Sequence, residues 1–339
     1  MNKTLLIALL VLGASAAPAL AQEGPMGSML AGPGGPGGPG GGDVVRYRFD
    51  DAFGRTGQPT ITDSRLDMGI IVSSSPYDNW SVNEHFGHFG LNAPVQIPNG
   101  GAAVPQSLWS EQTGVRYSRQ MDAGRAWGAN AGVGSDSDVL FHSMHETTLS
   151  LTLDAKVPSG DRNAWLFFLN YSNNRYFLSG LPIPGVAYQF QTESGKLRGL
   201  VGFPCSAFVW TPAPDWDGRL FLFGPRRLNL DAGYHVAGPV RLHGGFDWGG
   251  ETWLRSERSD NSDQLQFERK RLYAGVQTPL PGRLMLDLTG GRQFDQKFSV
   301  GHSFSASGSK ATLPPSWFLS ASINWRFGPE PSHPKGLSR

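Results

Sequence analysis

The chain has 339 residues, with 29 Lys and Arg against 28 Asp and Glu and a formal net charge of +1. This balance gives no reason to expect nucleic acid as a partner. The chain contains 45 Gly, 20 Phe and 10 Trp but only 17% charged residues, which is more typical of short strands and aromatic girdles than of a water-soluble enzyme. After the first apolar segment no run approaches the roughly 20 apolar residues of a membrane-spanning helix, so helical spans are excluded.

The N-terminus has the parts of an export signal. Lys3 gives a cationic start, Leu5–Leu12 is an apolar run, and Ala19-Leu20-Ala21 ends in small residues that predict cleavage before Gln22. The apolar run is too short to span a membrane as a helix. We therefore predict a signal peptide over residues 1–21.

The next segment, residues 22–43, is rich in Gly and Pro and cannot bury apolar surface. We expect it to be a flexible periplasmic leader. Residues 44–327 then form a single predicted domain in which short apolar-alternating segments are separated by turns. Its one cysteine, Cys205, cannot form an internal disulfide.

The domain is predicted to be an all-β, transmembrane, antiparallel up-and-down β-barrel of about 12 strands, or 14, because short and long connections alternate along it. The uncertainty lies before residue 114, where one strand or three are counted. The three candidates there are Val44–Asp50, Arg65–Ser73 and Asn79–Phe89. The later predicted strands, in chain order, are Gly114–Met121, Arg125–Gly134, Thr147–Val157, Asn163–Tyr171, Val186–Thr192, Leu197–Trp210 with a kink at Pro204, Arg226–Val236, Val240–Leu254, Gln266–Thr278, Arg283–Lys297 and Ser316–Phe327.

The alternation within these segments predicts which face meets lipid. Leu149, Leu151 and Leu153 alternate with Ser150 and Thr152, as expected of a strand with lipid on one side and a wet lumen on the other. The same parity predicts inward-facing charged side chains along several strands. The lumen-facing candidates are Asp154, Lys156, Asp231, His235, Arg241, His243, Asp247, Asp287 and Arg326.

The last predicted strand, Ser316–Phe327, has one continuous apolar face and ends in Trp325 and Phe327. A closing strand that ends in an aromatic resembles the assembly signal of Gram-negative outer-membrane β-barrels. The resemblance implies location in the cell outer membrane, with outer-membrane lipid, lipopolysaccharide and the barrel assembly machinery as partners. The polar, Pro-rich residues 328–339 depart from the commoner pattern with a terminal aromatic, and we predict a disordered periplasmic tail.

Three shorter segments narrow the resemblance. Leu181–Tyr188, Leu200–Pro204 and Val209–Pro212 are similar to the strand-turn pattern of an uncharacterised bacterial outer-membrane β-barrel family of unknown function. The resemblance implies fold and location, and it brings no catalytic residues with it.

Motifs for chemistry are weak. Gly301–Ser305 lacks the second glycine of a nucleophile elbow. His85/His88 and His142/His145 have a metal-like spacing, but residues three apart in a strand point to opposite faces, so either pair could bind a metal only from a loop or turn. His142/His145 is the pair that a loop could contain. We expect no catalytic residue, cofactor or metal, and interpret the chain as a passive channel or a structural envelope protein. The alternatives are a barrel-borne lipid- or lipopolysaccharide-modifying enzyme and a surface-binding receptor that acts through its loops.

Overall fold

The structure is a computed structural model that describes residues 43–98, 103–176, 178–224, 227–302 and 310–327. The expected export signal, leader and tail lie outside these residues, apart from Asp43. Among the described residues no helix is long and apolar enough to cross a membrane.

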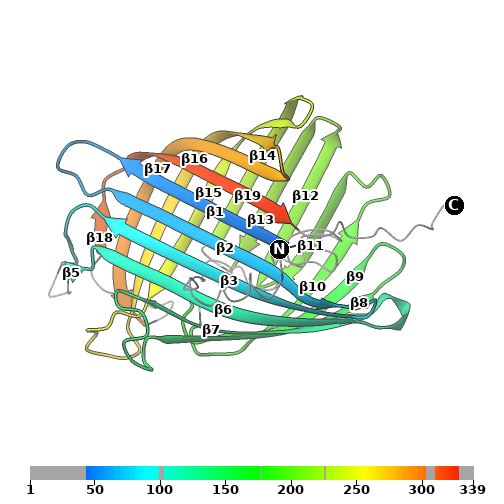
Figure 1. The fold of residues 1–339 in the computed structure, drawn as a ribbon, viewed down its shortest axis with the longest axis horizontal. Coiled ribbons are helices and arrows are strands. Elements are labelled where there is room, and N and C mark those ends of the chain that lie inside the picture. The colour runs from blue at the N-terminus through cyan, green and yellow to red at the C-terminus, as the bar shows by residue number, and fades with distance from the viewer. Residues whose placement is uncertain (1–42, 99–102, 177, 225–226, 303–309, 328–339) are drawn as a thin grey trace.

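Sixteen strands form one closed antiparallel wall, and Figure 1 shows β1 lying beside β19, the last strand of the chain. The first half of the wall consists of β1 (Asp43–Phe53), β2 (Ile61–Ser74), β3 (Asp78–Leu91), β6 (Ser107–Gln120), β7 (Ala126–Ser137), β8 (Thr147–Pro158), β9 (Ala164–Ser172) and β10 (Ile183–Gln191). The second half consists of β11 (Leu197–Phe203), β12 (Cys205–Ala213), β13 (Trp216–Phe223), β14 (Arg227–Ala237), β15 (Val240–Trp253), β16 (Gln264–Leu280), β17 (Leu284–Gly301) and β19 (Ser316–Phe327).

The first and last strands close the barrel. They pair over their whole lengths, from Asp43 opposite Phe327 to Phe53 opposite Trp317. Both ends of the described chain therefore lie at the same rim as the tight turns at Gly238-Pro239 and Pro281-Gly282, which is the periplasmic rim in barrels of this kind. Four further elements belong to the connections. They are the short strands β4 (Val95–Gln96), β5 (Ala103–Val104) and β18 (Lys310–Leu313), and the 3-10 turn η1 (Asp122–Gly124), which joins β6 to β7.

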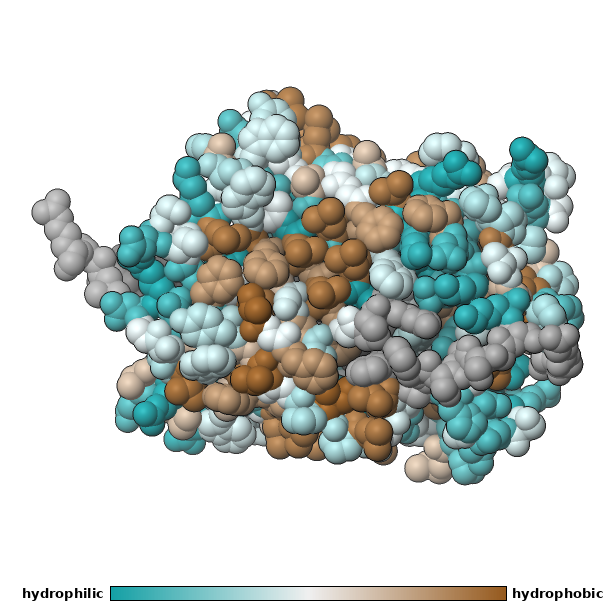
Figure 2. Space-filling model, turned by 180° about the vertical axis from the view of Figure 1, so that it is seen from behind, coloured by the Kyte–Doolittle hydropathy of each residue, from teal (hydrophilic) through white to brown (hydrophobic). Residues whose placement is uncertain are grey.

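The outside of the wall carries an apolar belt. Leu151, Leu230 and Leu288 are each between 44 and 48% exposed although nothing in the described chain packs against them as a core would. Figure 2 shows apolar side chains gathered in a broad band on the wall, with hydrophilic side chains towards the edges. A large apolar surface of this kind is stable against lipid and not against water.

The predicted strand number was too low. The segment Leu197–Trp210 is not one kinked strand but two, β11 and β12, which meet at Pro204. The residues between the predicted strands Leu197–Trp210 and Arg226–Val236, which we expected to form an outer loop, contain β13. β1, β2 and β3 all belong to the wall, as in the prediction of 14 strands. The division of Leu197–Trp210 into two strands and the presence of β13 raise the number from 14 to 16. The missing hairpin has short connections at both of its ends, and the alternation of long and short connections cannot reveal it.

The wall is tall on one side and low on the other. β16 and β17 have 17 and 18 residues, whereas β11 and β13 have 7 and 8. At the extracellular rim the tall side bends across the mouth, since the Leu254 N–H donates to the Asp136 carbonyl of β7 over 2.7 Å. β7 and β15 are diametrically opposite, because seven strands separate them on either side of the wall.

This contact is continued by the loops, and we call the ensemble of residues 136–146 and 252–264 the mouth bridge. Ser256 donates to the Asp138 carboxylate through its N–H over 2.7 Å and its hydroxyl over 3.0 Å. Arg258 forms a buried ion pair of 2.9 Å with Glu146. The β9–β10 loop packs beneath it, where Asn174 donates to Asp136 over 2.9 Å.

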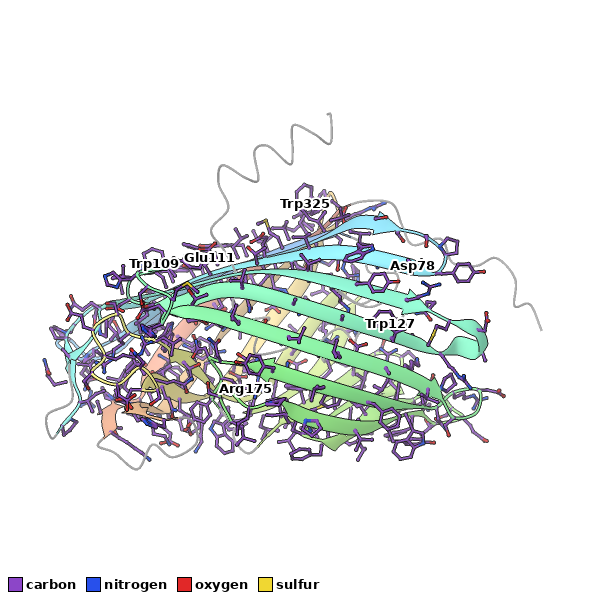
Figure 3. All side chains as sticks on the ribbon, turned by 90° about the horizontal axis from the view of Figure 1, so that it is seen from below. Asp78, Trp109, Glu111, Trp127, Arg175 and Trp325 are labelled. Carbon is purple, nitrogen blue, oxygen red and sulfur yellow. The ribbon has the colours of Figure 1, made fainter. Side chains whose placement is uncertain are left out.

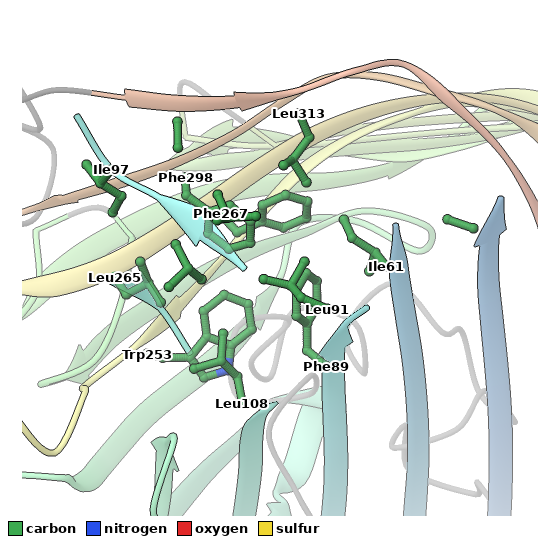
Figure 4. Close-up of a cluster of buried hydrophobic side chains, with 14 of the residues drawn as sticks. Ile61, Phe89, Leu91, Ile97, Leu108, Trp253, Leu265, Phe267, Phe298 and Leu313 are labelled. Carbon is green, nitrogen blue, oxygen red and sulfur yellow. The ribbon is translucent and has the colours of Figure 1, made fainter. Parts of the chain in front are cut away.

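Apolar side chains form a buried cluster at the bridged mouth (Figure 4). Inward-facing residues at the tops of the tall strands meet Val95, Ile97 and Val104, which belong to the segment between β3 and β6 and are buried. Phe89 stacks on Trp253 and Phe267 with ring centroids 5.2 and 5.1 Å apart. The cluster consists of Ala52, Ile61, Phe89, Leu91, Val95, Ile97, Val104, Leu108, Trp253, Leu265, Phe267, Phe298, Ala311, Leu313 and Phe318.

Candidate functional site

Below the apolar cluster the lumen contains a cavity of about 410 Å³. Its walls come from strands on both sides of the closing seam between β19 and β1, and many of its lining residues are charged. The charged lining residues are Arg48, Asp63, Arg65, Asp136, Arg219, Arg227, Asp231, Arg241, Asp247, Glu251, Arg269, Arg271 and Asp287, and the imidazoles of His85 and His243 lie among them.

The upper part of the lining is an ion-pair network, the upper network, that crosses the seam. Asp50 of β1 pairs with Arg48 on its own strand and with Arg271 of β16 at 2.9 Å. Arg271 also reaches Asp247 of β15 at 3.1 Å. Each of these side chains occupies an inward position of its strand. Because of the register in which the strands pair, they lie at the same height in the lumen.

The upper network continues into β2. Asp63 pairs with Arg65 at 2.6 Å and with Arg269 of β16 at 2.8 Å. Arg65 in turn pairs with Glu251 of β15. Four guanidinium groups thus alternate with four carboxylates across four strands, which neutralises the charge while leaving several polar atoms facing the cavity.

A second group, the lower network, lies nearer the periplasmic turns. Arg241 bonds Asp217 through two nitrogens, at 2.7 Å each, and also pairs with Asp231. His243 lies between two carboxylates, with Nδ1 3.0 Å from Asp231 and Nε2 3.2 Å from Asp287. Both ring nitrogens therefore have carboxylate partners, and the imidazole is held in one orientation.

The structure brings five of the nine lumen-facing candidates to this cavity: Asp231, Arg241, His243, Asp247 and Asp287. Asp154 lies on another part of the inner wall, where it pairs with Arg116 at 3.1 Å. His235 lies 3.4 Å from Asp217 near the turn rim. Lys156 and Arg326 do not line the cavity, and Arg326 is exposed at the end of β19.

The residues of the upper network on β1 and β2 were missed by the sequence prediction. In Arg46–Asp50, Arg and Asp alternate with Tyr47 and Phe49, which is the period-two signal of a wall strand. Arg269 and Arg271 were also missed, because charges occupy both parities in Glu268–Arg271 and hide the inward face.

The strand geometry separates the two members of the His85/His88 pair, whereas His142 and His145 lie in the connection between β7 and β8. His85 faces inward and pairs with Asp67, whereas His88 faces outward and lies 3.0 Å from the Ser107 hydroxyl. His302 of the Gly301–Ser305 motif contacts Asp263 at 3.0 Å, and residues 303–305 lie outside the described chain. Within the described ranges no group of three or more His, Cys, Asp or Glu side chains is placed to hold a metal ion. Cys205 is buried as a free thiol.

The assembly-signal candidates lie at the periplasmic rim. The Trp325 indole donates to the Gly282 carbonyl over 3.1 Å, and its ring lies 4.9 Å from that of Phe327. Phe327 is opposite Asp43, so these two aromatics sit where the last strand closes on the first.

No known protein family and no curated protein matches this sequence. Among solved structures, the monoaromatic hydrocarbon channel TodX is 10% identical, with 93% of this chain and 96% of that chain covered and a TM-score of 0.44. An outer-membrane channel from Pseudomonas putida F1 is 9% identical, with 85% and 96% covered and a TM-score of 0.33. The β domain of the Bordetella autotransporter BrkA is 12% identical, with 85% and 100% covered and a TM-score of 0.30.

The structure of the barrel itself indicates where the protein resides. A strand wall without a free edge and an outward apolar belt are the features that allow a β-structure to stand in lipid, where every backbone polar group must be satisfied internally. The predicted export signal and the aromatic end of the closing strand point to the outer membrane as well. The chain is an outer-membrane β-barrel protein.

Proposed function

We propose that this barrel is a passive channel for small hydrophilic solutes. The observation that carries the proposal is the charge-lined cavity of about 410 Å³ in the middle of a sixteen-strand lumen. Barrels of about eight strands are filled by their own side chains, whereas those of 16 to 18 strands are wide enough to hold an aqueous path.

The charged side chains of the cavity favour a wet lumen over a sealed structural core. Arg48 is 31% exposed, Asp247 27% and Asp287 25%. Ion pairs that served only to fill the barrel would be closed off from water, because burying a charge is costly unless it is fully paired. These groups instead keep part of their surface towards the cavity.

The lining also indicates the class of solute. Guanidinium and carboxylate groups alternate in the upper network, and the lower network places Arg241 and His243 among three carboxylates. Both signs of charge therefore line the cavity, and neither would exclude anions or cations. Small polar molecules that carry both charges, or none, meet complementary groups on the wall. The mouth bridge divides the extracellular entrance and limits the size of what can enter.

Gly249 on β15 allows a direct test. It lines the cavity, and a Cβ atom built on it meets no atom within 4 Å. Gly249→Trp should therefore fill part of the cavity without disturbing the wall, and Gly249→Ala is the matched control. In planar bilayers the refolded wild type and Gly249→Ala should conduct ions equally, while Gly249→Trp should reduce the single-channel conductance several-fold. Absence of conductance in the folded wild type, or equal conductance in Gly249→Trp, would refute the proposal.

A further inference from the structure

Ionisable side chains stand among apolar ones at two places on the outer face of the wall. The first is on β3 and β6. On β6 the inward positions Leu108 and Gln112 are buried, and the opposite parity includes Trp109, Glu111 and Val115, of which Val115 is 43% exposed. Glu111 therefore faces outward, between the aromatic Trp109 and the aliphatic Val115.

Glu84 on β3 lies beside Glu111 on the same face. Glu84 is opposite Thr113 and receives a 3.0 Å hydrogen bond from the Thr113 hydroxyl, and Phe86 is opposite Glu111. The two carboxylates are thus diagonal neighbours with like charge, an arrangement that is unfavourable when no cation is nearby. Among the described residues Glu111 has no hydrogen bond or ion-pair partner. We call Glu84, Glu111 and Thr113 the acidic patch.

The rim above the acidic patch is also unusual. Phe141 in the β7–β8 loop donates its N–H to the Ser135 hydroxyl over 3.0 Å, and Ser135 is opposite Glu111 in the sheet. Phe141 is 47% exposed and Met144 is 82% exposed. Large apolar side chains that stand free on an extracellular loop indicate a surface that is covered by another molecule.

The second group is on β16, β17 and β19. Arg292 follows Leu286, Leu288 and Gly290 on the outward parity of β17 and is exposed. Its cross-strand partners are Leu272 and Trp317, which are 55 and 57% exposed. Arg292 makes no ion pair or hydrogen bond with any residue in the described part of the chain. We call Arg292, Leu272, Trp317 and Leu319 the arginine patch.

The two patches lie at matching depths. Glu111 is nine residues from the periplasmic end of β6 at Gln120, and Arg292 is eight residues from the periplasmic start of β17 at Leu284. In Figure 3 Glu111 lies beside Trp109, towards the end of the barrel away from Asp78 and Trp127. Copies of the barrel share one orientation in the membrane, so two patches can meet between copies only if their depths agree.

We propose that these patches join copies of this chain side by side in the membrane, with Arg292 of one copy paired with Glu111 of the next. A charged side chain on a lipid-facing strand is costly and marks a contact with something other than lipid. Here the two patches have opposite charge, and neither Glu111 nor Arg292 has an ionic partner among the described residues of its own barrel. Each patch also includes or adjoins exposed apolar side chains that a neighbour would cover.

The geometry also fixes the kind of assembly. The contact joins two different surfaces, so it is heterologous and has no two-fold axis. Only β19, β1 and β2 separate β17 from β3 on the short way round the wall. Successive contacts therefore turn in one direction and close into a ring of three or more copies rather than an isologous dimer.

The test uses the full mature chain, extracted from outer membranes in mild detergent and examined by native mass spectrometry and light scattering. The wild type should give one discrete mass of three or more protomers. Arg292→Leu is better suited to lipid than arginine and should leave a folded barrel, recognised by a heat-dependent shift on a detergent gel, that is monomeric. Arg292→Glu and Glu111→Arg alone should also be monomeric, and the double charge exchange should restore the assembly.

Two outcomes would overturn the proposal. One is a wild type that is a folded monomer, in which case Arg292 and Glu111 face lipid or lipopolysaccharide instead of a second copy. The other is an assembly that persists in Arg292→Leu, which would place the contact elsewhere on the wall. Neither outcome bears on conduction through the lumen, because both patches lie on the outer face.

Discussion

The ion pair between Arg258 and Glu146 holds the mouth bridge closed, and the effect of removing it on the stability of the bridge can be calculated from the structure. The Arg258 and Glu146 side chains are only 2 and 3% exposed and are 2.9 Å apart. Glu146→Gln keeps the shape of the partner but leaves the guanidinium buried without a counter-charge. Breaking a buried pair in this way costs about 3–5 kcal/mol.

The lower end of that range applies here. Arg258 also donates to the carbonyls of Arg255 and His145, at 2.6 Å each, and of Asn261 at 3.1 Å, and these bonds remain in the variant. A loss of about 3 kcal/mol shifts the ratio of closed to open bridge by roughly 100-fold. The barrel wall, which is closed by its own strand ladder, should stay folded.

Amide hydrogen exchange reports the bridge directly. The N–H groups of Leu254 and Ser256 donate to Asp136 and Asp138 across the mouth, so their protection should fall by about 100-fold in Glu146→Gln. The double variant Glu146→Gln/Arg258→Met removes the stranded charge and should recover part of the protection. Asp260→Asn, at an exposed pair 3.6 Å from His302, is the control and should change nothing.

The same pair predicts the response of the bridge to acid. Although burial opposes it, the hydrogen bond from Ser143 and the charge of Arg258 hold the pKa of Glu146 below its usual value of 4.5. The stabilisation by the carboxylate is therefore complete above that value and is lost as the pH falls through the lowered pKa. Unchanged exchange in Glu146→Gln at neutral pH would refute this account of how the bridge is held.

Two further predictions concern the wall. Arg in place of Leu151, Leu230 or Leu286 on the lipid face should cost about 2–4 kcal/mol of stability near the midplane. Asn229 lines the cavity, so Asn229→Arg should be far milder in a denaturant titration of the refolded barrel. Equal destabilisation on both faces would mean that the faces are assigned wrongly. Deletion of residues 328–339 should leave membrane insertion intact in a fractionation assay, since Trp325 and Phe327 remain at the seam. Removal of Trp325–Phe327 as well should abolish insertion. Loss of insertion on the shorter deletion would contradict the position that we assign to the assembly signal.

The period-two pattern of apolar residues predicted the wall strands correctly wherever the connections between them are clearly long or clearly short. Thr147–Val157 was predicted and β8 runs from Thr147 to Pro158. It failed at β12 and β13, because strands of nine and eight residues joined by tight turns at both rims give no long loop to count. The residues themselves alternate there, but the spacing that separates one strand from the next is too short to detect.

The lumen was predictable only in part. Asp231, Arg241 and His243 stand on strands with clean alternation, and they line the cavity. The mouth bridge was not accessible from the sequence, since it joins Asp136 to Leu254 across the whole diameter of the barrel. Nor does any local pattern reveal that inward positions such as Phe267 and Phe318 are apolar because a loop folds down onto them.

The central claim is that solutes pass through the charge-lined cavity, and chemical modification at Gly249 tests it most directly. Gly249→Cys places a thiol in the open part of the cavity, while the native Cys205 is buried and should not react. During single-channel recording, a cationic methanethiosulfonate reagent should lower the current of Gly249→Cys in discrete steps and leave the wild type unchanged. A current that is insensitive to a thiol shown to be modified would contradict the account, because the path would then lie outside the cavity.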